Sequence, residues 1–147
     1  MNDITLYTIG SGGKSAEQFF TLLRKSGVKT MIDVRLKNTS HLAGFTKKQD
    51  LPFFLNEICG IGYLHIPLLA PTEEILIRYK KEKGPWEDYV SAFNRLLEHR
   101  RAETLLSGEQ LDRGCLLCSE PLPARCHRRL AAEYLASRIP RLQVTHL

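Results

Sequence analysis

Three cysteines and a histidine lie close together late in the sequence, and such a group could ligate a metal ion or supply a nucleophile. Cys115, Cys118, Cys126 and His127 fall within thirteen positions. A C-x-x-C pair binds zinc where a turn lets both sulfurs face one ion. Here two leucines separate the first two cysteines in a run typical of a strand, where side chains three positions apart point to opposite faces. The C-x-x-C spacing is present, but a strand does not let both sulfurs face one ion. We therefore predict no metal site.

A cysteine nucleophile is the second possibility. Enzymes that form phosphocysteine or persulfide intermediates surround the thiolate with backbone N–H groups. The segment after Cys118, SEPLPAR, has no glycine and two prolines, which donate no N–H. We therefore expect Cys115 and Cys118 to be small buried core residues. Cys126 is expected at a helix N-terminus, where the pKa of a thiol falls, and we place it in a ligand pocket.

His127 and Arg128 begin the helix that is predicted over residues 126–138. His127 shares a helical face with the apolar residues at 130, 131, 134 and 135, so it is expected to point inward, whereas Arg128 lies toward another face. A histidine there is often a packing residue. Beside Glu120 and beyond the end of a strand, it is also a candidate for proton transfer.

Two further segments could contact an anion. Gly10 and Ser11 begin GSGGKS, which lacks the first glycine of the G-x-x-x-x-G-K-[ST] phosphate loop, because position 8 is a threonine. We therefore expect no ATP, NAD or other cofactor, although such a turn can still present N–H groups to an anion. Asp33 and Arg35, in IDVR, project to the same side. They could form an internal ion pair, or the aspartate could hold the arginine for an anionic ligand.

These segments lie between strands and helices that alternate along the chain. This alternation predicts a single α/β domain over residues 1–147, a three-layer sandwich in which helices flank a mostly parallel sheet of about five strands. Ligands bind beyond the carboxyl ends of such strands, so Asp33, Glu120 and His127 could converge on one edge. Predicted strands cover 4–10, 29–36, 61–67, 114–120 and 142–147; predicted helices cover 15–27, 47–59, 71–79, 85–106 and 126–138; and 38–45 is predicted as a loop.

The composition is that of a globular domain, with 43% hydrophobic and 25% charged residues. No apolar run approaches the roughly 20 residues that cross a bilayer, and the first residues show no secretory signal. We therefore expect a cytoplasmic protein with reduced cysteines and no membrane partner.

The net charge of +5 is unevenly distributed. Residues 24–48 carry seven Lys or Arg against one acid, and residues 121–147 carry five Arg against one acid. This segregation indicates an anionic partner such as a nucleotide or nucleic acid, or else a basic face that is simply solvated.

The order of several segments resembles one protein family. YTIGSGGKS, IDVR, GIGYLHIPLLAPTEE, WEDY, LLCSEPLPARCHRRLAAEYL and VTHL together resemble the domain of unknown function 488 family over essentially the whole chain. The resemblance implies a small α/β sandwich and a site, but no reaction. Many members carry a histidine–serine pair where this chain has Ser11 and Gly12. The family's characteristic positions correspond here to Gly10, Ser11, Asp33, Arg35, Glu120, Cys126, His127 and Arg128.

The favoured hypothesis is an enzyme, or a degenerate enzyme, that acts on a phosphate-bearing substrate such as a nucleotide or nucleic acid. Asp33 or Glu120 would act as general acid or base and His127 as a proton relay. Arg35 and Arg128 would hold the anion. The alternatives are a noncatalytic nucleic-acid-binding module and a protein-interaction domain that uses the helices of residues 71–106.

Overall fold

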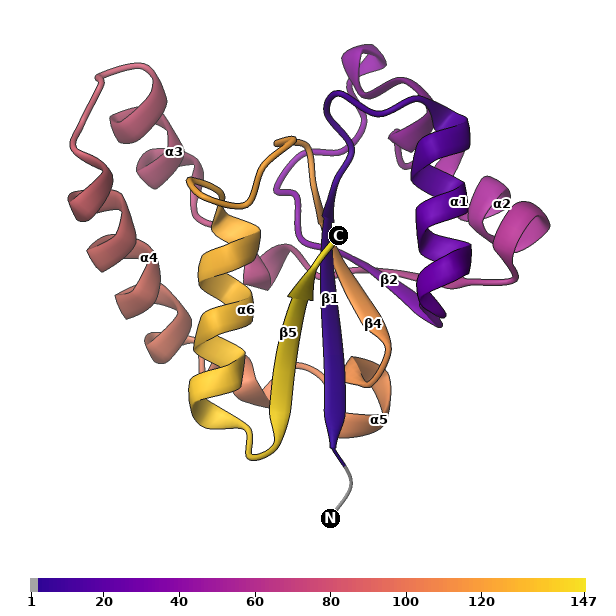
Figure 1. The fold of residues 1–147 in the computed structure, drawn as a ribbon. Helices are drawn as coiled ribbons and strands as arrows, with labels where there is room; N and C mark the ends of the chain where they lie inside the picture. The colour runs from indigo at the N-terminus through magenta and orange to yellow at the C-terminus, as the bar shows by residue number, and fades with distance from the viewer. Residues whose placement is uncertain (1–2) are drawn as a thin grey trace.

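The chain folds around one parallel β-sheet, as a computed structural model that describes residues 3–147 shows (Figure 1). The strand order is β3-β2-β4-β1-β5, and every neighbouring pair is parallel. The predicted three-layer α/β sandwich is confirmed, and the sheet is parallel throughout rather than mostly. The strands are β1 (Ile4–Gly10), β2 (Thr30–Asp33), β3 (Gly62–His65), β4 (Gly114–Cys118) and β5 (Leu142–His146).

One face of the sheet is covered by the helices that connect the first three strands. Phe19 and Leu23 of the first helix pack with Ile9 and Leu117 of the sheet in one apolar core, and Cys115 belongs to the same core. The helices on this face are α1 (Ala16–Ser26), α2 (Leu51–Phe54) and the π-helix η2 (Leu55–Cys59) that continues α2.

The opposite face carries the longer helices, and Figure 1 shows them on the other side of the sheet. Phe93 and Leu97 pack with Ala131, Leu6 and Leu116 in a second core. Among residues 3–147, no helix combines the length and the apolar character that crossing a membrane requires. The helices that follow β3 are α3 (Glu73–Lys80), α4 (Trp86–His99), the short α5 (Gly108–Leu111) and α6 (His127–Arg138).

Local sequence signals explain where α1 begins and ends. Ser15 accepts a hydrogen bond from the backbone N–H of Gln18, whose side chain accepts one from the N–H of Ser15, so both halves of a capping box are present. Gly27 ends the helix in the left-handed conformation, with φ of 77°.

Several elements differ in extent from those predicted. The second strand ends at Asp33 rather than 36, since the backbone N–H of Arg35 turns back to donate to Asp33 Oδ1. The helix predicted over 85–106 ends at His99, since Arg101 takes a left-handed φ of 51°. Residues 38–45, predicted as a loop, contribute to a 3-10 helix, His41–Thr46. The third and fourth strands end at His65 and Cys118, and the helix predicted over 47–59 begins at Leu51.

The topology leaves room for a cleft beside the ends of β2 and β4. These strands are neighbours, but β2 leads toward α2 on one face and β4 leads toward α6 on the other. Where the connections of adjacent parallel strands diverge in this way, the loops separate and leave room for a ligand. The loops that follow β2 and β4 begin at Val34 and Ser119.

Gly10 is a position where the fold leaves no room for a side chain. A Cβ there would collide with the backbone oxygen of Glu120 and with Nη1 of Arg128. We expect Gly10→Ala to lower the free energy of unfolding in urea by about 1–3 kcal/mol, the usual cost of overpacking. The control is Gly62→Ala in β3, where the nearest atom would lie 4.0 Å from the new Cβ; its effect should stay within about 0.5 kcal/mol. Equal effects would contradict the steric explanation.

Candidate functional site

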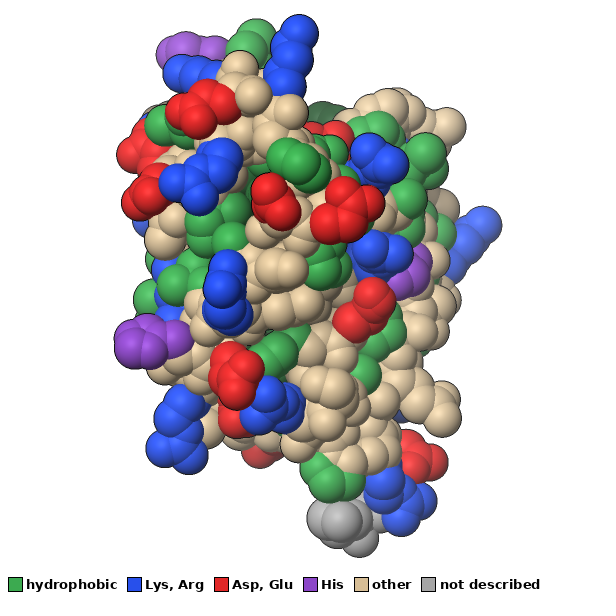
Figure 2. Space-filling model, turned by 90° about the vertical axis from the view of Figure 1, so that its left-hand side faces the viewer, with side chains coloured by type: hydrophobic (Ala, Val, Ile, Leu, Met, Phe, Trp, Pro, Cys, Tyr) green, Lys and Arg blue, Asp and Glu red, His purple; other side chains and the backbone are tan. Residues whose placement is uncertain are grey.

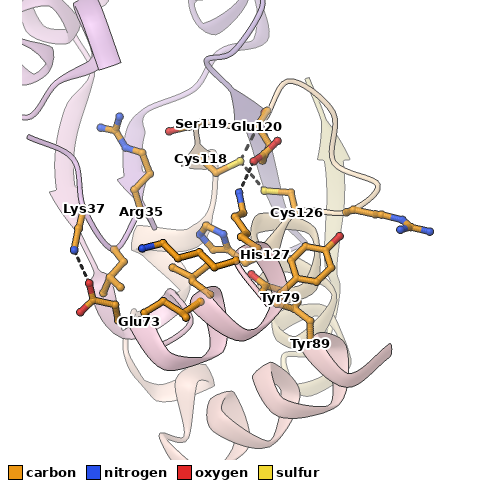
Figure 3. Close-up of a pocket in the computed structure, with 16 residues that line it drawn as sticks. Arg35, Lys37, Glu73, Tyr79, Tyr89, Cys118, Ser119, Glu120, Cys126 and His127 are labelled. Atoms are coloured by element: carbon orange, nitrogen blue, oxygen red, sulfur yellow. Dashed lines mark hydrogen bonds and ion pairs between the residues drawn. The ribbon is translucent and has the colours of Figure 1, made fainter. Parts of the chain in front are cut away.

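A cleft of about 420 Å³ opens at the carboxyl edge of the sheet, between the ends of β2 and β4 and the helix α3 (Figure 3). This volume lies within the range of about 300–1,000 Å³ that is usual for ligand pockets. Cationic and anionic side chains line one part of the cleft, and apolar and aromatic side chains line another. The apolar part is formed by Leu76, Ile77, Tyr79 and Tyr89.

The structure brings together several of the residues that the sequence singled out. Glu120, Cys126 and His127 line the cleft, and so does Arg35. Asp33 lies at the same edge, at the end of β2 beside β4, but its side chain is fully buried and does not line the cleft. The predicted convergence at one sheet edge is therefore found.

Ser11 lines a neighbouring cavity of about 530 Å³, which shares Arg35, Lys37 and Ser119 with the cleft. The glycine-rich loop beside it has few N–H groups left for a ligand. The N–H of Ser11 donates to the carbonyl of Cys118, and that of Gly12 donates to the carbonyl of Ser119, each at 3.0 Å. These bonds continue the pairing of β1 with β4 past the strand ends. The geometry fits the tight-turn interpretation of this segment better than the anion-loop interpretation.

Asp33 and Arg35 form a buried ion pair. Both carboxylate oxygens accept hydrogen bonds from the guanidinium, each at 2.8 Å, and the side chains of Asn38 and Tyr63 donate to Oδ2. Burial opposes ionisation, but the hydrogen bonds and charge of Arg35 outweigh it and lower the pKa of Asp33. A carboxylate so fully engaged is a positioning group rather than a proton acceptor.

Arg35 itself is directed away from the cleft's interior. Its guanidinium also donates to the backbone oxygen of Thr46 at 2.7 Å, and Figure 3 shows it pointing away from Cys118 and His127. Its side chain is 4% exposed. Arg35 therefore fixes the loop after β2 against residues 41–46 and leaves the cleft's accessible positive charge to other residues.

His127 is held as a neutral imidazole. Its Nε2–H donates to the carbonyl of Val34 at 2.6 Å, which leaves Nδ1 as the acceptor. Burial lowers its pKa to about 4, against the opposing effect of the Val34 carbonyl. At neutral pH this histidine is uncharged, and its lowered pKa makes Nδ1 a weak proton acceptor with no proton to donate.

Arg128 occupies a place that the helical pattern did not predict. It lies at the second position of α6 and was expected on another face, yet its side chain is fully buried behind the cleft. Nη1 donates to the carbonyl of Glu120 at 2.7 Å and to Sγ of Cys118 at 3.0 Å. Nε donates to the hydroxyl of Thr8 at 3.3 Å. The side chain therefore joins α6 to β1 and β4 and does not reach the cleft's surface.

Cys118 is buried and Cys126 caps α6, as expected, but the pKa values of the two thiols differ from expectation. Cys118 lines the cleft, and its sulfur lies 2.7 Å from that of Cys126. Burial disfavours the Cys118 thiolate, but the hydrogen bond from Cys126 and the charge of Arg128 outweigh burial and lower the pKa of Cys118 to about 7. The bond that Cys126 donates and its burial raise the pKa of Cys126. The thiol with the lowered pKa is thus Cys118 rather than the helix-capping Cys126.

Cys118 is the site residue that the sequence interpretation missed. Its place at the end of a strand was visible, but the flanking leucines and the prolines that follow favoured a core role. Cys115 does occupy the core, as predicted. Among residues 3–147, no three His, Cys, Asp or Glu side chains gather closely enough to hold a metal ion.

A comparison with protein families tests the resemblance to the domain of unknown function 488 family. The family model of the domain of unknown function DUF488 matches residues 15–135. The chain belongs to the DUF488 family. Asp33, Arg35, Glu120 and the 126–128 segment of this DUF488 chain lie within the matched region, whereas Gly10 and Ser11 precede it. Searches of curated proteins and of solved structures find no match.

The Asp33–Arg35 pair predicts a pH-dependent stability. Asp33→Asn leaves a buried guanidinium without its counterion, so the free energy of unfolding at pH 7 should fall by about 3–5 kcal/mol. Because the folded pKa of Asp33 lies below the unfolded one, its contribution is complete above about pH 4 and is lost as the pH falls further. Urea denaturation should therefore show a large difference in the free energy of unfolding between Asp33→Asn and wild type at pH 7, and a smaller difference at pH 3. The control Glu82→Gln changes an exposed carboxylate and should unfold with the wild-type free energy at both pH values. An equal difference between Asp33→Asn and wild type at pH 7 and pH 3 would contradict a lowered pKa for Asp33.

His127 predicts a second dependence in a higher pH range. Its folded pKa of about 4 lies below the ordinary value of 6.5, so the unfolded chain binds the additional proton as the pH falls from about 6.5 to 4. Over that range, the free energy of unfolding of wild type should fall by up to about 3 kcal/mol more than that of His127→Gln. Denaturation curves at pH 7 and pH 4.5 measure it, with His41→Gln, at an exposed position, as the control. A parallel loss in wild type and His127→Gln would show that His127 titrates normally.

Proposed function

We propose that the cleft binds an anionic, phosphate-bearing ligand of nucleotide size. The observation that carries this proposal is the lining of the cleft. Lys37, Lys80, Lys81 and Arg125 supply positive charge on one part, and the aromatic rings of Tyr79 and Tyr89 lie with aliphatic side chains on another. A nucleotide has the matching parts, a charged phosphate and a flat base.

The positive charge at the cleft can be redirected to a ligand at low cost. Lys37 pairs with Glu73 at 2.6 Å and Lys80 with Glu120 at 2.9 Å, but all four side chains are about half exposed or more. Exposed pairs of this kind contribute about 0–1 kcal/mol. Within residues 3–147, the cleft's other exposed cations, Lys81 and Arg125, form no ion pair.

The proposed catalytic roles follow from the protonation states. His127, neutral with Nδ1 as acceptor, would accept a proton from a nucleophile bound in the cleft. Glu120 would act as the carboxylate acid or base once a ligand draws Lys80 away. Asp33 would act indirectly, as a positioning residue that holds Arg35 and the loop after β2. Arg128 would contribute its charge from behind the cleft.

A nucleic-acid strand is the alternative ligand. The cavity beside the glycine-rich loop shares Arg35, Lys37 and Ser119 with the cleft and adds Lys14. A longer anion could therefore pass from one to the other. On the face that Figure 2 shows, positive and negative side chains are interspersed. This arrangement favours a ligand confined to the cleft over a duplex that spreads across this face.

Calorimetric titration tests the proposal directly. The purified protein would be titrated at low and near-physiological salt with adenosine and guanosine 5′-diphosphates, inorganic phosphate, and short single-stranded DNA and RNA. We expect a nucleotide to bind and Lys81→Ala/Arg125→Ala to raise its Kd about tenfold or more, the loss expected when charge-assisted hydrogen bonds are removed.

The matched control is Lys29→Ala/Arg95→Ala, which removes the same charge at two exposed positions outside the cleft. Its Kd should change less than about twofold. Binding of the oligonucleotides alone, weakened by the cleft variant, would favour the nucleic-acid alternative. Absence of binding by every probe, or equal losses in the two double variants, would overturn the cleft as a site for phosphate-bearing ligands.

A further inference from the structure

Arg128 carries a charge that no carboxylate neutralises. Its side chain is fully buried, and among residues 3–147 it forms no ion pair with an aspartate or glutamate. Nη2 has no hydrogen-bond partner there either. A guanidinium stays protonated in proteins, and a buried charge is costly unless an opposite charge is near. The side chains that accept hydrogen bonds from the Arg128 guanidinium are those of Thr8 and Cys118, and of these the thiol is the one that can become an anion near neutral pH.

A second sulfur lies next to this thiol. Cys126 caps α6 and accepts a hydrogen bond from the backbone N–H of Arg128, and its Sγ is 2.7 Å from Sγ of Cys118. When Cys118 is ionised, Cys126 is the donor in that contact. Both residues belong to the lining of the cleft, although their side chains are almost fully buried, and Figure 3 shows the two sulfurs beside each other. A disulfide needs sulfurs about 2.05 Å apart, so a small movement of residues 119–125 would bond them.

We propose that Cys118 and Cys126 form a reversible dithiol–disulfide couple that opens on the cleft, with a small anionic disulfide as its oxidant. The couple is a second activity of this region and does not depend on the nucleotide proposal. Lys80, Lys81 and Arg125 at the cleft favour an anionic disulfide over a neutral one. Cys118 is the attacking residue, and Cys126 is the resolving residue.

The reaction balances with the groups present. The Cys118 thiolate attacks one sulfur of the small disulfide, forms a mixed disulfide and releases a thiolate. That thiolate takes the proton of Cys126. The Cys126 thiolate then attacks Sγ of Cys118, closes the Cys118–Cys126 bond and releases the second small thiolate. The protein loses two electrons, and the small disulfide is reduced by two electrons to two thiol equivalents.

The other cysteines lack these features and serve as internal comparisons. Cys115 is fully buried in the apolar core, and burial raises its pKa. Cys59 is partly exposed, and burial raises its pKa also. Other titratable groups near the two sulfurs are Lys14, Lys80 and Tyr89, together with Glu120 and His127 of the cleft lining. Lys80 lines the cleft and Lys14 lines the neighbouring cavity; both add positive charge that favours the thiolate, whereas the Glu120 carboxylate opposes it.

The test is oxidation of the full chain in glutathione buffers that range from reduced to oxidised. Free thiols are blocked with N-ethylmaleimide, and intact and peptide masses identify the bonded cysteines. We expect a Cys118–Cys126 disulfide, with the loss of two hydrogen atoms, that reverts on reduction. Cys126→Ser should instead accumulate glutathione on Cys118, whereas Cys118→Ser should leave Cys126 unmodified. Cys59→Ser is the control and should oxidise as wild type does.

The pH dependence of alkylation shows whether Cys118 is a reactive thiolate or merely lies close to Cys126. Iodoacetamide should modify Cys118 half-maximally near pH 7, well below the ordinary thiol value of about 8.5. Circular dichroism would confirm that each variant is folded. The proposal is overturned if folded wild type keeps both thiols free throughout the series, if bonding involves Cys59 instead, or if Cys118 reacts with the profile of an ordinary thiol. Lys81→Ala/Arg125→Ala leaves both sulfurs in place, so it should slow oxidation by an anionic disulfide without preventing the Cys118–Cys126 bond. Loss of nucleotide binding in this variant and failure of wild type to form the disulfide are therefore separate outcomes.

Discussion

The guanidinium of Arg128 connects the parts of the molecule that form the cleft. It extends from α6 and contacts Thr8 of β1, Cys118 of β4 and the backbone of Glu120. The hydroxyl of Thr8 in turn contacts His146 of β5 at 2.6 Å. The Arg128 side chain thus joins one helix to two strands, and Thr8 extends these contacts to a third strand. The absence of a side chain at Gly10 is what lets the backbone of Glu120 and this guanidinium come so close.

The two buried arginines at this edge are neutralised in different ways. Arg35 has the Asp33 carboxylate, and its charge stays within that pair. The charge of Arg128 instead acts on its surroundings, where it favours the thiolate of Cys118 and, together with burial, lowers the pKa of Lys14. The proposed dithiol couple therefore depends on the charge of Arg128, whereas the proposed anion site depends mainly on the exposed cations of the cleft. An anion in the cleft disfavours the thiolate, and disulfide formation removes it, so by linkage each event alters the free energy of the other.

The sequence determines the architecture more readily than the site. Apolar runs separated by helical patterns predict a parallel sheet between helices, because both faces of each strand must be buried. The ends of the strands and helices were less predictable. β2 ends where the side chain of Asp33 binds the backbone of Arg35, and α4 ends where Arg101 takes a left-handed conformation. The DUF488 family match covers several residues of the candidate site but indicates no chemistry.

Arg128 shows why the remainder of the site was hidden. A charged residue next to another arginine on a helix looks solvated, and its burial depends on partners 120 and 10 positions away in the chain. Cys118 could not be identified without it, because a strand-end thiol among leucines resembles a packing residue until a charge lies beside it. Long-range contacts of this kind have no periodicity that a sequence pattern could reveal.

The strand order also has a consequence for biosynthesis. β1 is made before the other four strands of this sheet, yet both its neighbours come from residues 114–146. While the intervening segments are synthesised, β2 and β3 can pair with each other, but β1 has two open edges. Pairings of such long sequence separation form slowly, and an unpaired apolar strand is prone to associate with other chains. Until β4 arrives to complete the centre of the sheet, α1 is the neighbouring element that can cover one face of residues 4–10, because Phe19 and Leu23 pack against Ile9.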